Sequence, residues 1–326
     1  HIRYLGSRGR FTEIAPLLVE LVGSVESVSI PIPDRLRGEY QGSTPTVAMH
    51  EGKRRGIVRG VNYRQAVDQE TIFSGPGRDK CRTRNWWIEF DDNWRPVTAK
   101  VMEGPYGERP GAVQGYEDCR LFWSGGQWRA SCTFAERPNL YGQGAYALLC
   151  EMALLDISDG GNVERARALR GPWSVYNQKN WRPACTEREP LRWIYSADPL
   201  VLVTPEMSTW RHSGAWVTAS AWRGSSQAIP FRGGWLWVDH RPVVGFDGPR
   251  HLYLHRFSWA DAALERVELV SPPFVFQSYG VEFCAGMVVD GERVVSETSS
   301  QDGRRVVNFT KLCENKLILY RKFSFR

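Results

Sequence analysis

The sequence predicts an all-β protein of the β-propeller class. Apolar and aromatic strands recur along the chain at a spacing of roughly 45 to 65 residues, close to the period of propeller blades. Gly-Gly and Asp-Gly pairs punctuate these strands, which is typical of hairpins. No strict sequence repeat accompanies the spacing. The strands that carry this pattern cover residues 114–134, 191–196, 235–244, 281–289 and 293–298.

The composition excludes several other classes of protein. With 42% hydrophobic and 24% charged residues among 326, the chain is neither disordered nor fibrous and can bury a large core. Its length alone would suggest two domains, yet all-β domains reach this length as one unit. The 14 Trp, 14 Phe and 12 Tyr residues supply side chains for the core and for stacking on sugar rings.

The charge indicates which partners to expect. A formal net charge of +6 and a pI of about 9.0 favour an anionic ligand such as phosphate, a sugar phosphate or a nucleotide. The basic residues are scattered, and residues 53–55 form the only short basic run, so nucleic acid is not an expected partner. No apolar run reaches the roughly 18 residues of a membrane-spanning helix, so no membrane partner is expected. A homo-oligomer is compatible with the sequence.

The seven Cys residues form no CxxC pair and no Cys/His metal pattern. Their odd number argues against a full disulfide framework. We therefore expect a cytoplasmic protein in a reducing compartment, with no bound metal and no cofactor other than a phosphate-containing co-substrate.

An N-terminal extension precedes the predicted strands. Residues 11–22 carry apolar side chains at helical spacing, which predicts a short amphipathic helix despite Pro16. Residues 25–32 alternate like a strand. We expect a helical extension over residues 1–28 and a propeller catalytic domain over residues 29–326.

The first predicted sheet begins with a hairpin. Residues 44–50 and 56–64 alternate in polarity around a turn that contains Gly52. Residues 67–82 have the Gly and Pro content of an irregular insertion. A Trp-rich strand is expected at 83–90.

The stretch at 114–134 carries the clearest chemical signal. Glu117 and Asp118 place two adjacent carboxylates at the start of an apolar strand, and Arg120 follows closely. The strand turns through Gly125-Gly126 into a partner strand, so a catalytic group here would be held rigidly. The alternative is a structural ion pair of these carboxylates with Arg120.

The second half of the chain continues the strand pattern. A strong apolar strand is predicted at 145–157, and a polar segment around Lys179 precedes the strand at 191–196. Residues 250–259 form a further predicted strand. The apolar and basic segment 317–325 is expected to pair with an N-terminal strand and close the ring, which would remove exposed sheet edges.

Four short motifs stand out in these strands: Gly115-Tyr116-Glu117-Asp118-Cys119-Arg120, Lys179-Asn180-Trp181 with residues 195–199, Trp237-Val238-Asp239-His240, and Val281-Glu282-Phe283-Cys284-Ala285-Gly286 with Asp290-Gly291. In this order they resemble the motifs of glycoside hydrolase family 130, whose five-bladed β-propeller enzymes include inverting β-mannoside phosphorylases and some hydrolases, and of the related mannosyltransferase/phosphorylases. Cys119 stands where that family has Pro.

The resemblance implies a five-bladed propeller and an inverting reaction with Asp118 as the general acid. Such an acid protonates the leaving glycosidic oxygen while a nucleophile attacks the opposite face of the sugar. A phosphate nucleophile needs fixed positive charge, for which we predict Lys179 and His240, supported by Arg120 and Arg182. The alternatives are a solvated loop for Lys179 and a core position for His240.

Sugar contacts are expected from a further set of side chains in or near the same motifs. A hydrolase would instead place a carboxylate beside the attacking water, for which Glu187, Glu189 and Glu282 are available. The predicted sugar ligands are Asn62, Arg64, Tyr116, Glu117, Trp181, Asp198 and Glu282.

The expected function is therefore the transfer of a hexosyl unit, by the resemblance a mannosyl unit, between a glycoside and phosphate or an activated sugar donor. The expected partners are a carbohydrate together with phosphate, a sugar phosphate or a nucleotide sugar. Two alternatives are a glycoside hydrolase of the same fold and a non-catalytic sugar-binding propeller module of a larger glycan-assembly protein.

Overall fold

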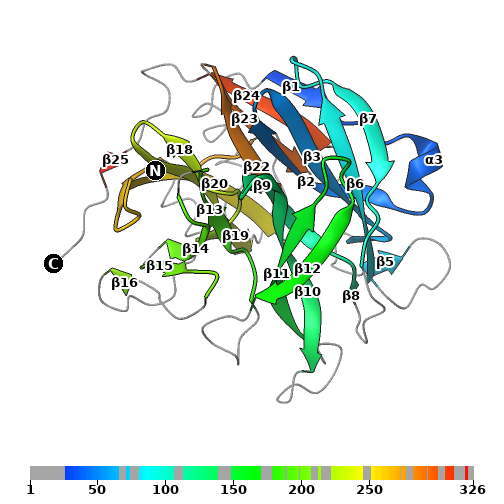
Figure 1. Ribbon diagram of the computed structural model, residues 1–326, viewed down its shortest axis with the longest axis horizontal. Helices are drawn as coiled ribbons and strands as arrows, with labels where there is room; N and C mark the ends of the chain where they lie inside the picture. The colour runs from blue at the N-terminus through cyan, green and yellow to red at the C-terminus, as the bar shows by residue number, and fades with distance from the viewer. Residues whose placement is uncertain are drawn as a thin grey trace.

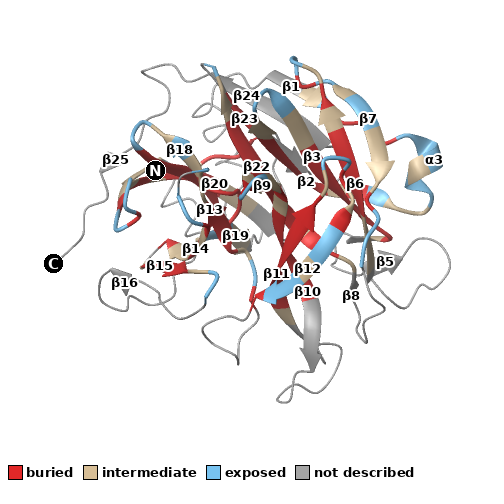
Figure 2. Ribbon diagram, viewed as in Figure 1, coloured by how far each residue is buried: buried red, intermediate tan, exposed pale blue. Residues whose placement is uncertain are grey.

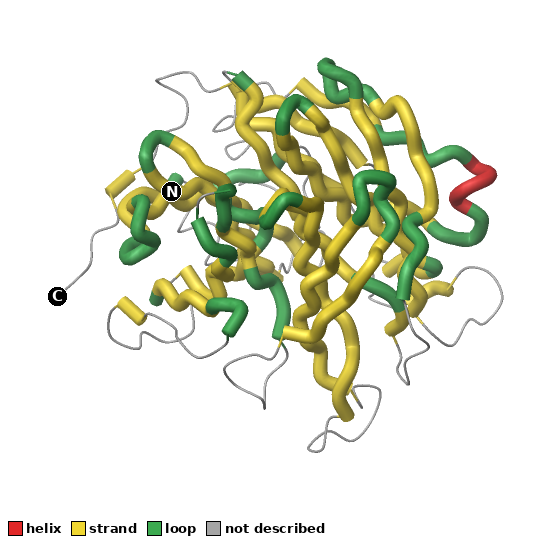
Figure 3. The backbone as a smooth tube through the Cα atoms, viewed as in Figure 1, coloured by secondary structure: helices red, strands yellow, loops and turns green. Residues whose placement is uncertain are grey.

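Strands make up nearly all of the regular structure (Figure 1; Figure 3). Within the described residues, α3 (Asp34–Arg37) is the only helix. The predicted helix at 11–22 lies outside the described residues, so it and the domain boundary after residue 28 stay predictions. The computed structural model describes residues 26–65, 71–73, 81–105, 113–138, 148–169, 178–187, 189–197, 199–206, 212–213, 222–244, 251–271, 273–276, 282–291, 293–299, 305–311 and 320–321.

The first sheet contains the predicted hairpin and the Trp-rich strand. Its order is β2-β3-β6-β7, and β8 lies parallel to β6. A separate two-stranded sheet, β4 and β5, lies partly in the region expected to be irregular. The bounds are β2 (Gln41–His50), β3 (Lys53–Val61), β4 (Tyr63–Gln65), β5 (Thr71–Phe73), β6 (Cys81–Phe90), β7 (Pro96–Val101) and β8 (Val113–Gln114).

The second sheet contains the two adjacent carboxylates. Its order is β12-β11-β10-β9, and the turn between β9 and β10 is the predicted Gly125-Gly126 pair, with φ angles of 60° and 77°. Trp123 lies opposite Trp128 beside this turn. The bounds are β9 (Glu117–Ser124), β10 (Gln127–Pro138), β11 (Leu148–Ile157) and β12 (Val163–Leu169).

Three further sheets lie in the rest of the described chain. The third has the order β13-β14-β15-β16, the fourth β17-β19-β20-β21-β25 with β18 beside β19, and the fifth β1-β24-β23-β22. Their bounds are β13 (Arg182–Ala184), β14 (Arg192–Ala197), β15 (Leu200–Val203), β16 (His212–Ser213), β17 (Arg223–Gly224), β18 (Ile229–Phe231), β19 (Gly234–Val244), β20 (His251–Asp261), β21 (Val267–Val270), β25 (Tyr320–Arg321), β1 (Glu26–Ser29), β22 (Phe283–Asp290), β23 (Arg293–Ser299) and β24 (Arg305–Lys311).

The arrangement is all-β and propeller-like, with four fully developed blades in the described residues instead of the five predicted. Four sheets contain strands of seven residues or more, such as β10 with 12 and β19 with 11. The third sheet differs because its described strands have only two to six residues. The blade strands therefore form as the alternation predicts, while the size of this one sheet departs from it.

Hydrophobic clusters join each sheet to the next around a ring. One cluster packs Trp87 of the first sheet on Trp128 of the second, and another packs Phe122 of the second sheet with Trp193 of the third. The other three clusters join the third sheet to the fourth, the fourth to the fifth, and the fifth back to the first. Figure 2 shows these buried strands toward the middle of the molecule and exposed turns at its rim.

A buried polar segment, residues 225–228, links all five of these sheets. The Ser225 hydroxyl donates to the Cys284 carbonyl of β22 at 2.6 Å, and the Gln227 amide donates to the Val47 carbonyl of β2 at 2.8 Å. The Ala228 backbone N–H donates to Pro183 of β13. Arg120 of β9 donates to the Ser225 carbonyl, and the backbone N–H of β19 residue 238 donates to the hydroxyl of residue 226. We call residues 225–228 the central segment.

The ring closes differently from the prediction for residues 317–325. β1 pairs with β24, with Glu26 opposite Phe309, so the N-terminal strand completes the fifth sheet. β25 instead extends the fourth sheet, with Arg321 opposite Leu269. For the two residues of this segment that the structure describes, 320 and 321, the expected pairing with an N-terminal strand is wrong, because they add to the edge of β21 while β24 pairs with β1.

Candidate active site

A bulge at the start of β9 brings both carboxylates to one side. Glu117 lies opposite Thr133 and Arg120 lies opposite Ser131, so Asp118 and Cys119 share a single partner position on β10. Asp118 has a φ of 48°, in the left-handed region that non-glycine residues seldom adopt. Adjacent residues of a regular strand point to opposite faces, whereas a bulge redirects one of them.

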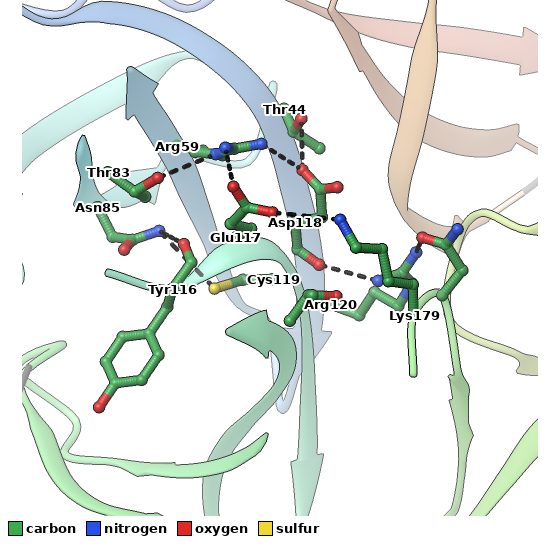
Figure 4. Close-up of polar contacts among 12 residues, drawn as sticks. Thr44, Arg59, Thr83, Asn85, Tyr116, Glu117, Asp118, Cys119, Arg120 and Lys179 are labelled. Atoms are coloured by element: carbon green, nitrogen blue, oxygen red, sulfur yellow. Dashed lines mark hydrogen bonds and ion pairs between the residues drawn. The ribbon is translucent and has the colours of Figure 1, made fainter. Parts of the chain in front are cut away.

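Arg59 of β3 binds both carboxylates (Figure 4). Its guanidinium donates to Glu117 Oε1 at 2.7 Å and to Asp118 Oδ1 at 3.0 Å. It also donates to the Thr83 and Tyr63 hydroxyl oxygens, both at 3.3 Å. The Arg59 side chain is 8% exposed, and these four hydrogen bonds to protein groups hold it in place.

Asp118 is held as a carboxylate but stays open to solvent. The Thr44 hydroxyl donates to Oδ1 at 3.0 Å, and 25% of the Asp118 side chain is exposed. Burial by itself would raise the pKa of Asp118, yet the positive charges of Arg59, Arg120 and Lys179 lower it below its ordinary value. The group is therefore ionised at neutral pH.

Lys179 places an accessible positive charge beside the carboxylates. Its Nζ lies 3.8 Å from Glu117 Oε2, and 45% of the side chain is exposed. Burial acts to lower the pKa of Lys179, but Glu117, Cys150 and Asp118 raise it above its ordinary value. Lys179 is therefore a cation that can also contact a ligand.

Arg120 is a buried cation next to Asp118 and Asn180. It is 0% exposed and donates to Ser225 O at 2.6 Å, to the Asp118 carbonyl at 2.9 Å and to Asn180 Oδ1 at 3.2 Å. Burial lowers the pKa of Arg120 to about 10. These hydrogen bonds hold the backbone of Asp118 and the side chain of Asn180, the residue after Lys179. Arg120 therefore has a structural role in the site.

The structure places Arg182 and His240 differently from Lys179. The Arg182 side chain is 1% exposed, and its guanidinium donates to Asp239 Oδ1 at 2.6 Å. His240 is 2% exposed and stacks on Tyr253, with ring centroids 5.1 Å apart. Burial, reinforced by neighbouring His and Arg side chains, lowers the pKa of His240 well below its ordinary value. The anion-binding roles of these two residues stay predictions.

Arg223 is an exposed cation that the sequence analysis did not select. It lies opposite His240 in the pairing of β17 with β19. Its charge lowers the pKa of both His240 and Tyr253, while the nearby Asp118 carboxylate acts on Tyr253 in the opposite direction. Arg223, like Asp118 and Lys179, therefore lies near enough to Tyr253 to act on its pKa. Only the register of a two-residue strand reveals this, and no local pattern in the sequence marks it.

Most predicted sugar ligands have structural contacts. Asn62 is 0% exposed and its side-chain oxygen accepts from the Arg82 backbone at 2.7 Å. The Tyr116 hydroxyl donates to Pro105 O at 2.9 Å, and Trp181 is 0% exposed. Their roles as sugar ligands stay predictions. The side chain of Arg64 and the whole of Asp198 lie outside what the structure describes.

The carboxylates considered for a hydrolase are also engaged elsewhere. Glu282 is 1% exposed and accepts from the Phe276 backbone N–H at 2.8 Å. Glu189 pairs with Arg192 at 2.8 Å, and Glu187 lies 3.5 Å from a ring nitrogen of His50. The structure does not bring these residues to Asp118 through any contact that it describes; Glu117 is the carboxylate that it does bring there.

Two absences hold for the described part of the chain. No group of three or more His, Cys, Asp or Glu side chains is placed there to hold a metal ion. No helix in that part is long and apolar enough to cross a membrane.

Comparison with known proteins identifies the fold. No protein-family model and no curated protein matches the sequence. A mannose phosphorylase from Leishmania mexicana, solved with a phosphate ion, matches with a TM-score of 0.60 and 12% identity over 96% of this chain and 97% of that chain. A β-1,2-mannobiose phosphorylase from Listeria innocua matches with a TM-score of 0.57 and 13% identity, covering 87% and 93%.

A third match is a GDP-Man-dependent mannosyltransferase from Leishmania mexicana, with a TM-score of 0.56 and 9% identity over 93% of this chain and 92% of that chain. A further solved structure belongs to a study of the GH130 family of mannoside phosphorylases and its glycoside hydrolases. This chain therefore has the fold that these GH130 mannoside phosphorylases share with the Leishmania mannosyltransferase and phosphorylase.

Proposed function

We propose that the protein is an inverting enzyme that transfers a mannosyl unit between a glycoside and phosphate or an activated sugar donor. Proteins of this fold include two phosphorylases, and one of them was solved with phosphate. The observation that carries the proposal is that the Asp118 carboxylate is partly exposed to solvent and lies among positive charges, with the exposed ammonium group of Lys179 nearby.

We also propose that the propeller has five blades. The third sheet has short strands, but it occupies its own place in the ring, because one hydrophobic cluster joins it to the second sheet and another to the fourth. The central segment also bonds to β13 of this sheet, as it does to a strand of every other large sheet. We count the third sheet as the remaining blade on these grounds.

Asp118 takes the role of the acid–base group. In the direction of glycoside synthesis, the acceptor hydroxyl gives its proton to the Asp118 carboxylate while its oxygen bonds to the anomeric carbon and the bond to phosphate breaks. In the reverse direction the protonated form of the same carboxyl gives its proton to the leaving glycosidic oxygen, while phosphate bonds to the anomeric carbon from the opposite face and the glycosidic bond breaks. The low pKa of Asp118 keeps the resting group in the form that accepts a proton.

Lys179 and Arg223 supply the charge for the anionic substrate. Both are exposed cations, and both act to lower the pKa of the Tyr253 hydroxyl. A phosphoryl group bound between such cations would be oriented as well as attracted. Arg120 and Arg182, which are buried and bonded to protein groups, would add field without direct contact.

Phosphate is favoured over water as the nucleophile. An inverting hydrolase needs a second carboxylate that is free to take a proton from water. Glu117 is the neighbouring carboxylate, but Arg59 binds one of its oxygens at 2.7 Å and the Lys179 ammonium lies 3.8 Å from the other. Cations thus lie beside both oxygens of Glu117, so neither oxygen is left free for a water molecule, and Glu117 suits the binding of sugar hydroxyls better than the activation of water.

The test uses mannose 1-phosphate and GDP-mannose as donors, with mannose and short mannosides as acceptors, and measures the release of phosphate or nucleotide. We expect release by the wild type and a loss of roughly 10²- to 10⁴-fold in Asp118→Asn. Asp156→Asn is the matched control, because Asp156 lies in the same sheet and pairs with Arg129 at 3.0 Å. No release with any donor, or full activity in Asp118→Asn, would contradict the proposal.

A further inference from the structure

The two oxygens of Asp118 have different surroundings. Thr44 Oγ1 and Arg59 both donate to Oδ1, each at 3.0 Å, whereas the described residues provide no hydrogen-bond donor for Oδ2. A carboxylate oxygen accepts about two hydrogen bonds in its plane, so Oδ1 is saturated. A proton or a substrate hydroxyl must therefore approach Oδ2.

The two donors come from a different blade than the acid. Thr44 lies on β2 and Arg59 on β3, both in the first sheet, while Asp118 begins β9 of the second sheet. Thr44 is 7% exposed and Arg59 is also buried, so neither side chain swings freely. The first sheet thus sets the orientation of a carboxyl group whose own backbone lies in a bulge.

We propose that Thr44 and Arg59 are positioning residues that act through Asp118: together they occupy Oδ1, and so make Oδ2 the single atom that exchanges a proton with the substrate. This inference rests on the proposed role of Asp118 as the acid–base group. It goes further because it assigns the oxygen atom that reacts and places the two residues that orient the carboxyl group on the neighbouring sheet.

Arg59 acts on charge as well as on orientation. It is the nearest positive charge to Asp118, and it also binds Glu117, so its guanidinium is committed to the protein and not to the substrate. The other titratable groups that interact electrostatically with Asp118 are Arg120 on the same strand, Lys179 before β13, Tyr253 on β20 and Cys150 on β11. None of these donates to Oδ1, so Arg59 and Thr44 should have effects that the others do not share.

The experiment measures the ionisation of Asp118 directly. Protein labelled with ¹³C at the Asp carboxyl carbons is titrated by NMR, and the Asp118 signal is assigned by its absence in Asp118→Asn. The variants are Thr44→Val, Arg59→Lys and Arg59→Met. Arg55→Met is the matched control, because Arg55 lies on the same strand and pairs with Glu89 at 3.6 Å, away from Asp118.

We expect the Asp118 midpoint to move upward in Arg59→Met, less in Thr44→Val and Arg59→Lys, and not at all in Arg55→Met. If Arg59→Met does not fold, as circular dichroism would show, Thr44→Val and Arg59→Lys carry the test. Thr44→Val is the cleanest of these, because it removes one donor from Oδ1 and leaves the Glu117 contact intact. An unchanged midpoint in both Thr44→Val and the folded Arg59 variants would overturn the inference.

Activity is measured in parallel so that two failures can be told apart. With an active donor and acceptor, the acidic limb of kcat/KM should move upward together with the NMR midpoint in each variant. Shifted midpoints without turnover of any donor would support the positioning role and contradict the proposed function. Turnover of a donor, with a pH profile and an NMR midpoint that none of these variants changes, would support the proposed function and contradict the positioning role.

Discussion

Two Arg–Asp pairs with a buried guanidinium, Arg59 with Asp118 and Arg182 with Asp239, differ in how many hydrogen bonds the carboxylate accepts. Asp239 is 0% exposed, and each of its oxygens has two donors. Asp118 has two donors on one oxygen, none in the described residues on the other, and a side chain that is 25% exposed. A saturated carboxylate can only hold structure together, whereas a half-saturated one can still accept a proton.

The electrostatics of the two carboxylates are alike, so charge alone does not separate them. Burial would raise the pKa of each, and neighbouring Arg side chains lower it for both. What separates them is the bulge, which turns Asp118 toward the open side while Asp239 stays in a regular part of β19. A low carboxyl pKa is therefore a poor guide to a catalytic site unless an open oxygen accompanies it.

The largest expected effect is on stability, and it separates the two pairs. Asp239→Asn should destabilise the protein by about 3 to 5 kcal/mol, because it removes the only carboxylate that pairs, among the described residues, with the buried guanidinium groups of Arg182 and Arg256. Asp118→Asn should change the free energy of unfolding much less, because solvent reaches that side chain. Urea unfolding of both variants measures this. Equal losses would mean that Asp118 is scaffold too.

A neutral polar cluster gives the next largest effect. Gln227 donates to Val47 O at 2.8 Å and Met287 O at 2.9 Å, and accepts from the Met287 backbone N–H at 3.0 Å. Gln227→Leu leaves these backbone groups unsatisfied and should cost about 2 to 4 kcal/mol. Thermal unfolding checks the value. A loss far below 1 kcal/mol would mean that the central segment does not hold the sheets together.

Two buried histidines, which lie opposite each other on β19 and β20, should make the protein sensitive to acid. Burial lowers the pKa of His240 well below its ordinary value and lowers the pKa of His255 to about 3. Below about pH 6.5 these histidines are protonated in the unfolded chain but stay neutral in the folded protein. The free energy of unfolding is therefore highest above that pH and falls toward pH 5. His240→Phe should remove about 1 to 2 kcal/mol of this fall.

The free energy of unfolding at pH 7, 6 and 5 measures that change. His50→Gln serves as a control, because His50 lies near the surface in the stack with Trp123 and contacts neither Asp118 nor Asp239 in any described interaction. A wild-type curve that is flat from pH 7 to 5 would contradict the prediction.

The smallest effect is expected from an exposed ion pair and provides the baseline for the others. Lys53 and Asp159 lie 3.2 Å apart, with 46% and 67% of their side chains exposed. Lys53→Met should change the free energy of unfolding by no more than about 0.5 kcal/mol. A larger change in the same urea series would show that surface pairs contribute comparably, which would weaken the contrast between the buried clusters.

The strands and part of the site follow from local sequence patterns. Alternation and turn residues predict the hairpins β2–β3, β9–β10 and β22–β23, because side-chain periodicity and glycine conformations act over a few residues. The short motifs predict Glu117, Asp118 and Lys179 as site residues, and the structure brings them together. The all-β, propeller-like class is therefore readable from the chain itself.

Other features depend on contacts between residues far apart in the sequence. Asp118 accepts hydrogen bonds from Thr44 and Arg59, which lie 74 and 59 residues away in the sequence, and no local pattern predicts these partners. The bulge that redirects Asp118, the exposure of Arg223 and the pairing of β1 with β24 also arise only when strands align. By itself the sequence determined which segments become strands and which carboxylates begin β9. The tertiary structure decided which oxygen stays open, because that depends on donors from a neighbouring sheet.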